Sequence, residues 1–169
     1  MIDRLTPPAT EAEIHELAEV LVDAVRSGAS VSFLEPFTLD DAEQWWRRTL
    51  ASANERAIFL VARDDEGIAG TVQVQPAWAP NQPHRGDVAK LLVHRRARGR
   101  GVGAALMRAA ETGARDAGFT LLTLDTVRGD NAERLYERAG WTRVGVIPDY
   151  ALFPDGSLCD TVVFYKKLS

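Results

Sequence analysis

The stretch that decides the fold is Lys90–Met107, KLLVHRRARGRGVGAALM. Its first residues complete an apolar run that starts at Val88, and such a run predicts a strand. Gly99, Gly101 and Gly103 then lead into an amphipathic segment, which predicts a helix. Glycines let the main chain approach a phosphate closely, and the first turn of a helix offers backbone N–H groups to an anion. Four arginines add positive charge around this loop: Arg95, Arg96, Arg98 and Arg100. We therefore predict a pyrophosphate-binding site here.

The composition is that of an ordinary soluble protein, with 169 residues, 46% of them hydrophobic and 26% charged. This size favours a single domain over residues 1–169. The net charge of -4 argues against general binding to nucleic acid. Cys159 is the only cysteine and the three histidines are scattered, so we expect neither a disulfide nor a metal site. No signal or membrane segment is evident, and we expect a cytoplasmic monomer or homodimer with no membrane partner.

Local patterns predict a mixed α/β fold that is antiparallel at first and has a βαβ unit in the middle. Capping boxes at Thr10 and Thr38 open two helices, and the apolar loop 31–37 between them either covers a substrate or packs beneath a helix. The strands are expected at residues 2–5, 57–62, 68–75, 86–93, 119–124, 141–147 and 161–166. Two further helices are expected, one from Ala105 to the residue before Gly118 and one over 131–139.

The glycine loop has competing interpretations. Gly99-x-Gly101-x-x-Ala104, with Asp125 downstream, formally matches a nicotinamide dinucleotide fingerprint. However, residues 94–98 separate it from its strand, the preceding strand follows a hairpin, and too little chain remains for further βα units. A Walker loop is excluded, because no Gly-Lys-Ser/Thr sequence follows. A glycine-rich connection without a ligand is the remaining alternative.

Two motifs carry a resemblance to a known family. Val93 followed by Arg98–Gly103 resembles the acetyl-coenzyme A motif of the GCN5-related N-acetyltransferases (GNAT). The segment 129–141 resembles the second motif of that family, with Asn131, Tyr136, and then a glycine and an aromatic residue at 140 and 141. Residues 125–156 are similar to the tabtoxin-resistance type within the family. The resemblance implies a central mixed, mostly antiparallel sheet with a parallel βαβ acetyl-CoA core flanked by helices.

The resemblance also implies how acetyl-CoA is held. Backbone N–H groups of residues 98–104 would bind the pyrophosphate, and the strand before them would offer main-chain groups to the pantetheine amides. Asn131 would hydrogen-bond the pantetheine arm, although it could equally be the cap of its helix. The cofactor-binding residues implied are Leu91, Leu92, Val93, Arg98, Gly99, Arg100, Gly101, Val102, Gly103, Ala104, Asn131 and Tyr136.

The implied reaction is direct transfer of an acetyl group from acetyl-CoA to an amine. Tyr136 matches the general acid that protonates the leaving thiolate, although it could simply be a half-buried helix residue. Asp87 lies where many family members carry a glutamate base, but it could instead pair with Arg85. Asp125, just past a buried strand, is the second candidate base or a turn-forming residue before Thr126. By position, the two carboxylates should lie toward opposite ends of parallel strands.

Three functions agree with this pattern. The first is an N-acetyltransferase that acts on a primary amine of a small, amino-acid-like or antibiotic-like molecule. The second is a protein or peptide N-acetyltransferase, which would need a peptide groove. The third is a non-catalytic acetyl-CoA sensor. The presence of Asp87, Asp125 and Tyr136 favours an enzyme, and the loops 31–37 and 78–84 should decide the acceptor.

Overall fold

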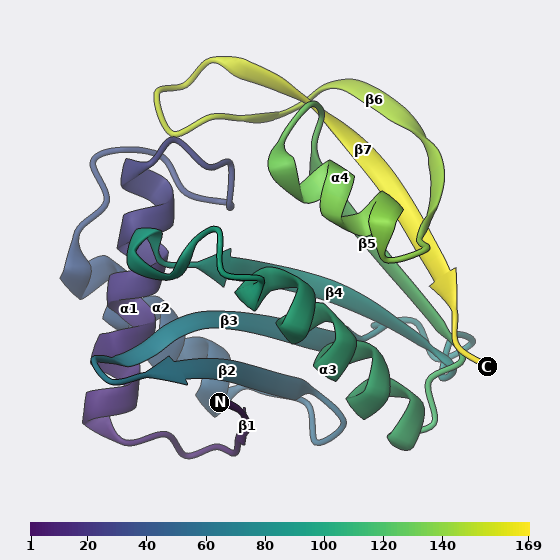
Figure 1. The fold of residues 1–169 in the computed structure, drawn as a ribbon, viewed down its shortest axis with the longest axis horizontal. Helices are drawn as coiled ribbons and strands as arrows, with labels where there is room; N and C mark the ends of the chain where they lie inside the picture. The colour runs from purple at the N-terminus through teal and green to yellow at the C-terminus, as the bar shows by residue number, and fades with distance from the viewer.

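The computed structural model describes residues 1–169 and contains one seven-stranded sheet with strand order β1-β2-β3-β4-β5-β7-β6. All neighbouring strands are antiparallel except β4 and β5, which are parallel and connected through a helix (Figure 1). The strands are β1 (Ile2–Leu5), β2 (Ile58–Asp64), β3 (Gly67–Pro76), β4 (Arg85–Val93), β5 (Leu121–Val127), β6 (Thr142–Leu152) and β7 (Leu158–Lys167). The helices are α1 (Glu11–Arg26), α2 (Leu39–Ala51), α3 (Val102–Asp116) and α4 (Asn131–Arg138), with a short 3-10 turn, η1 (Arg95–Ala97). The expected mixed α/β fold is confirmed.

Helices cover both faces of the sheet, and the core therefore has two parts. On one face α3 buries Leu106 against residues such as Val74 of β3. On the other face α1 and α2 pack on β2 through a cluster that includes Leu17, Trp46 and Phe59. The indole N–H of Trp46 donates to the Leu17 carbonyl (3.1 Å), so the burial of this large side chain leaves no polar atom unpaired. No helix is long and apolar enough to cross a lipid bilayer.

Local signals in the sequence are confirmed where they are strongest. Both helices of the first pair begin with a capping box, Thr10 with Glu13 and Thr38 with Asp41. The loop 31–37 packs against a helix, which was the second of its two expected roles. Phe33 lies 4.4 Å from Phe37 and 5.5 Å from Trp45 between ring centroids.

The last strands are longer than their sequence pattern predicts. β6 continues to Leu152 through Pro148, which the pattern places after the end of the strand. It can do so because the register shifts between Ile147 and Ala151, and proline is tolerated at such a bulge on an edge strand. Similarly, β5 extends through Val127, so Asp125 lies within the strand rather than just past it.

The parallel pair comes apart after three residues. Positions 85–87 of β4 pair with 121–123 of β5, and no pairing continues beyond them. β4 carries an irregularity at this point, because its register against β3 shifts between Thr71 and Gln73 and Lys90 has a positive φ of 53°. A bulge bends its strand and increases the local twist. The two strands therefore diverge toward the glycine loop (Figure 1), and we call the gap between their unpaired main-chain edges the opening.

Candidate active site

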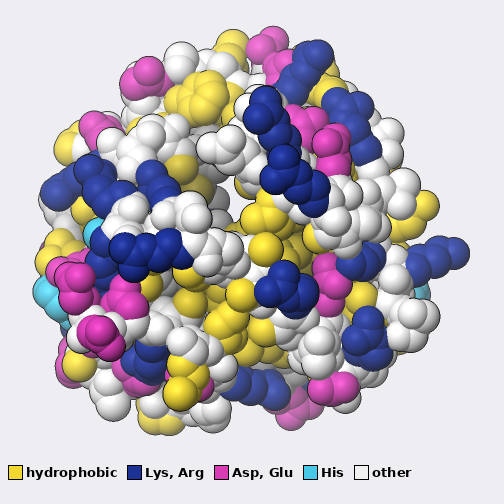
Figure 2. Space-filling model, in the orientation of Figure 1, with side chains coloured by type: hydrophobic (Ala, Val, Ile, Leu, Met, Phe, Trp, Pro, Cys, Tyr) yellow, Lys and Arg dark blue, Asp and Glu magenta, His cyan; other side chains and the backbone are white.

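The opening between β4 and β5 is bordered by main-chain groups without strand partners. From Val88 onward β4 pairs only with β3, and from Leu124 onward β5 pairs only with β7. Each strand therefore presents one edge to the opening, and such edges bind an extended ligand as an added strand would. Figure 2 shows the surface hollowed in this part of the molecule, with hydrophobic side chains exposed there.

The glycine loop at the wide end of the opening supplies free N–H groups. Gly99 and Gly101 have φ values of 74° and 75°, a region that other residues adopt only with strain. Gly101 is the N-cap of α3 and provides no side-chain acceptor, and the first intrahelical bond comes from the N–H of Ala105. The backbone N–H groups of residues 99–104 consequently have no acceptor within the protein. The predicted series starts one residue later than expected, because the N–H of Arg98 donates to the Arg95 carbonyl (3.3 Å).

Three of the four arginines around the loop form ion pairs within the protein. Arg95 and Arg98 both form ion pairs with Asp23 of α1. Arg96 pairs with Asp64 at 3.0 Å and also donates to the Ile68 carbonyl. These three arginines therefore tie the loop to its surroundings, and their role toward an anion stays a prediction.

The remaining arginine, Arg100, has no partner within the protein. Arg100 is exposed and has no ion-pair or hydrogen-bond partner, so it is available for a ligand phosphate.

Asp23 is only 7% exposed and was missed by sequence reasoning. Burial alone would raise the pKa of Asp23, but hydrogen bonds from the side chain and N–H of Arg95, with the nearby positive charges, lower it. The available signal was one acidic residue inside the apolar run of a helix.

Tyr136 lies on α4 with its ring buried and its hydroxyl unpaired. The residue is 5% exposed, and its ring packs between Trp141 and Phe164 at centroid distances of 6.1 and 5.8 Å. The hydroxyl forms no hydrogen bond with the protein and is not sealed from solvent. Burial, and then the negative charges of Asp130 and Asp125, raise the pKa of Tyr136 well above its usual range. The phenol is therefore protonated at neutral pH and can donate a proton.

Asn131 is not the cap of its helix. Asp130 takes that position and accepts a hydrogen bond from the N–H of Asn131 (2.6 Å). The side chain of Asn131 is exposed and makes no hydrogen bond within the protein. Its side-chain amide is thus free to bind a ligand at the N-terminal end of α4.

The two candidate carboxylates are closer together than their chain positions indicate. Asp87 lies directly opposite Thr123 of β5. Asp125 is two residues beyond Thr123, and this length of strand is about 7 Å at the usual rise per residue. The expectation that they lie toward opposite ends is therefore corrected. Asp87 is held at the closed end of the opening by Arg85 and Thr123, which both donate to its Oδ1.

Asp125 lies at the open end of the same strand pair. It is exposed, and its Oδ2 accepts a hydrogen bond from Thr161 at 3.0 Å. Its negative charge acts on both Tyr136 and Lys90. Lys90 is a second residue that sequence reasoning missed, and a single charged side chain within an apolar strand was the available signal.

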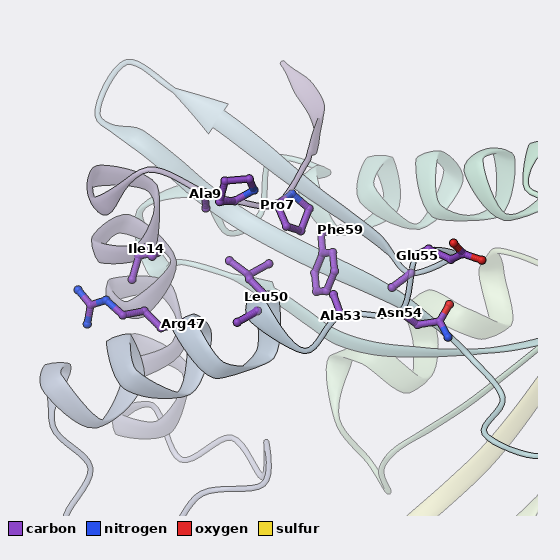
Figure 3. Close-up of a pocket in the computed structure, with 12 residues that line it drawn as sticks. Pro7, Ala9, Ile14, Arg47, Leu50, Ala53, Asn54, Glu55 and Phe59 are labelled. Carbon is purple, nitrogen blue, oxygen red and sulfur yellow. The ribbon is translucent and has the colours of Figure 1, made fainter.

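A pocket of the protein also lies elsewhere. It has a volume of about 550 Å³ and lies between the segment before α1, the end of α2 and β2 (Figure 3). Its walls are largely apolar, with Ile14, Leu50 and Phe59, and Arg47 at its rim is already paired with Glu11 at 2.6 Å. None of the candidate residues lines it. The candidate site lies instead along the unpaired edges of β4 and β5.

Comparisons with known proteins agree with this geometry. The acetyltransferase (GNAT) family matches over residues 19–141. An uncharacterized N-acetyltransferase in the hisH–hisA intergenic region of Azospirillum brasilense is 34% identical over 115 residues, 67% of each chain. The crystal structure of ribosomal-protein-alanine N-acetyltransferase from Brucella melitensis has a TM-score of 0.82 and 22% identity, and 99% of each chain is covered. The structure of YncA from Salmonella typhimurium with its cofactor acetyl-CoA has a TM-score of 0.80 and 18% identity, over 100% of this chain and 94% of that one.

Free amides at a helix start, opening onto two strand edges and a buried phenol, are suited to an acyltransferase that uses a coenzyme A thioester. This chain belongs to the GNAT family of acetyltransferases. It is accordingly an acetyl-CoA-dependent N-acetyltransferase, and acetyl-CoA is its cosubstrate. The dinucleotide-binding alternative is thereby excluded.

Proposed function

We propose that the protein transfers the acetyl group of acetyl-CoA to a primary amine of a small molecule by direct attack. The observation that carries this proposal is the Tyr136 hydroxyl, unpaired and close enough to Asp125 for its pKa to respond to that charge. A donor and an acceptor of protons thus border one opening, as a reaction that deprotonates an amine and protonates a thiolate requires.

The packing of the loop 31–37 favours a small acceptor over a peptide. Phe33 of this loop stacks on Phe37 and packs edge-to-face on Trp45 of α2, and a packed aromatic loop suits a closed pocket better than a long peptide groove. The likeness to a ribosomal-protein-alanine N-acetyltransferase does not decide the matter, since 22% identity carries the fold and not the acceptor. We extend the proposal to the tabtoxin-resistance type, on the resemblance of residues 125–156, which lie in β5, α4, β6 and the turn before β7.

The cofactor residues follow from the free groups of the site. The N–H groups of residues 99–104 would hold the pyrophosphate, with Arg100 as the available cation. The main chain of Leu91–Val93 and the amide of Asn131 would bind the pantetheine arm. Tyr136 would face the sulfur. Acetyl-CoA supplies an activated acetyl thioester in this arrangement.

The chemistry of the protein is then proton transfer. An alkyl amine, with a pKa of about 10, is mostly protonated at neutral pH and must lose a proton before it attacks. We assign the removal of that proton to Asp125, directly or through water. Asp87 is the second candidate, since its Oδ1 already accepts from two donors. As the N–C bond forms and the C–S bond breaks, Tyr136 gives its proton to the departing thiolate.

A thiol-release assay tests this proposal. The purified protein is incubated with acetyl-CoA and, separately, with amino acids, their decarboxylated amines, aminoglycosides and a set of peptides. Turnover of a free small amine, lost in Tyr136→Phe, is the expected result. Turnover confined to peptides would overturn the small-molecule assignment. Tight acetyl-CoA binding without any turnover would favour a sensor.

A further inference from the structure

Lys90 occupies an unusual position in the wall of the opening. It lies in β4 next to the irregular part of the strand, and its positive φ of 53° departs from the strand conformation. Neighbouring Val88 belongs to the core beneath α3, whereas the side chain of Lys90 reaches the loop before α2 on the other face. The bulge thus turns a charged side chain toward the face where Asp125 also lies.

The ammonium group of Lys90 has few partners within the protein. It donates one hydrogen bond, to Ser32 Oγ at 3.0 Å, and no carboxylate lies within 4.0 Å. Phe33 and Trp45 flank it with ring centroids 5.7 and 5.4 Å from Nζ. An ammonium has three donors, so two remain without an acceptor. Burial lowers the pKa of Lys90, and the negative charge of Asp125 opposes that effect.

A second unmatched donor lies on the same side of the sheet. Gln73 of β3 is 3% exposed and pairs with Ala89, the residue before Lys90. Its Nε2 has no hydrogen-bond acceptor, while its Oε1 accepts from Gln75 at 3.1 Å. Buried polar groups are normally paired, so this part of the site has donors in excess of acceptors. An acceptor oxygen of a ligand would pair with these donors.

We propose that Lys90 is a specificity residue that binds a carboxylate of the acetyl acceptor, so that the acceptor is an α-amino acid or a close analogue. The proposal rests on the proposed function and names its substrate class. An amino acid is a zwitterion, and the opening holds one cation and one exposed anion that are not paired with each other, Lys90 and Asp125. The ammonium of the acceptor would lie toward Asp125, which removes its proton, and the carboxylate toward Lys90. The rings of Phe33 and Trp45 lie beside the ammonium and add a cation–π attraction to it.

Matched acceptors test this assignment. The kcat and KM are measured by thiol release for methionine and 3-(methylthio)propylamine, and for phenylalanine and phenethylamine, which differ only in the carboxylate. We expect the wild-type protein to prefer the acid of each pair by about tenfold or more, as for a hydrogen bond between charged groups. Lys90→Met should remove this preference by raising KM for the acids, so that the acid and the amine of each pair come to have similar kcat/KM values. Lys90→Arg should retain most of it.

Two controls separate the possible outcomes. Lys167→Met removes an exposed lysine at the end of β7 and should change neither ratio. If Lys90→Met weakens both members of a pair equally, Lys90 only supports the loop at Ser32 and the inference is overturned. An unchanged preference for the acid would overturn it as well.

A binding measurement keeps the inference separate from catalysis. Calorimetry of the protein saturated with coenzyme A compares N-acetylmethionine with N-acetyl-3-(methylthio)propylamine. Tighter binding of the acid that is lost in Lys90→Met supports the carboxylate site even if no amine is turned over, in which case only the proposed function fails. Equal binding of the two in the wild-type protein overturns the carboxylate site.

Discussion

Asp87 of β4 lies directly opposite Thr123 of β5, and the hydroxyl of Thr123 donates to the Asp87 carboxylate at the last residue pair that joins the two strands. The carboxylate therefore sits at the point of divergence, where Arg85 also donates to it. This arrangement indicates a structural duty for Asp87 at the closed end of the opening. It leaves Asp125, two residues further along, as the carboxylate that faces the open end.

The first prediction separates these two carboxylates. Asp125→Asn should lower kcat/KM at neutral pH by about tenfold or more, since the acceptor ammonium then lacks a general base. The loss should shrink as the pH rises, because the amine then releases its proton to water without a base. Asp87→Asn should keep the wild-type profile of rate against pH and instead lower the free energy of unfolding by about 1 kcal/mol, because the half-exposed pair with Arg85 is partly screened by solvent. Rate profiles across pH and urea titrations measure the two effects. A loss of rate at neutral pH in Asp87→Asn alone would reverse the assignment.

The second prediction concerns the proton donor. Tyr136→Phe should reduce kcat by about a hundredfold or more, within the range for general acid catalysis. Cofactor affinity and stability should change little, since the hydroxyl has no hydrogen-bond partner and the ring stays packed on Trp141 and Phe164. Tyr150→Phe, on an exposed tyrosine of β6, is the matched control. Single-turnover rates and acetyl-CoA titrations distinguish chemistry from binding. Retention of full turnover in Tyr136→Phe would exclude the phenol as the acid.

The third prediction tests the glycine loop with a matched glycine. Gly101 and Gly118 lie at opposite ends of α3, both have positive φ, and a Cβ at either would meet no atom within 4 Å. Valine at each should cost roughly 1–2 kcal/mol of stability through backbone strain. Only Gly101→Val should weaken acetyl-CoA binding, by tenfold or more, because it disturbs the free N–H groups. Thermal melts and calorimetry measure both. Equal loss of affinity in the two variants would point to a general effect of strain.

The fourth prediction distinguishes the arginines. Arg100→Ala should weaken acetyl-CoA binding severalfold and reduce its dependence on salt, since one exposed cation near a phosphate is lost. Arg96→Ala should leave the affinity unchanged and lower stability by about 1 kcal/mol, because this side chain serves Asp64 and the Ile68 carbonyl. Affinity measured at two salt concentrations is the readout. Weaker binding in Arg96→Ala alone would mean that the wrong arginine has been taken as the free one.

The fifth prediction concerns acid stability. The pKa of Asp23 lies below its ordinary value of 3.8, so its folded-state ion pairs stabilise the protein above that pH. This contribution is lost as the pH falls through the lowered pKa. The stability difference between the wild-type protein and Asp23→Asn should therefore be full at pH 6, at about 2–3 kcal/mol for a buried paired charge, and shrink below pH 4. Denaturant titrations at several pH values follow it. A difference that stays constant down to pH 2 would contradict the role of the charge.

Sequence reasoning succeeded where local chemistry decides the structure. Capping boxes at Thr10 and Thr38 begin their helices, and β2 and β3 form a hairpin from the strands expected at 57–62 and 68–75. The glycine loop and the buried face of α3 also follow from spacing alone. These features depend on residues close in the chain, so their signals survive without any tertiary context.

The site itself depends on tertiary contacts that no local pattern carries. The separation of β4 from β5 arises from a bulge at Lys90 and from two different strand partners, and neither is visible in an apolar run. The duties of Arg95 and Arg98 depend on Asp23, more than 70 residues earlier in the chain. Similarly, Pro148 indicates the end of a strand by its type, yet an edge bulge accommodates it.

The parting of the parallel strands also has a mechanical consequence. With only three residue pairs across it, this line is the place where the amino-terminal strands and the β5–β7–β6 group are least firmly joined by backbone hydrogen bonds. The pantetheine arm of acetyl-CoA, bound between the two edges, would hydrogen-bond to both strands and so connect the two parts of the sheet. Amide hydrogen exchange in both β4 and β5 should therefore slow together when acetyl-CoA is added, including at positions that the cosubstrate never touches.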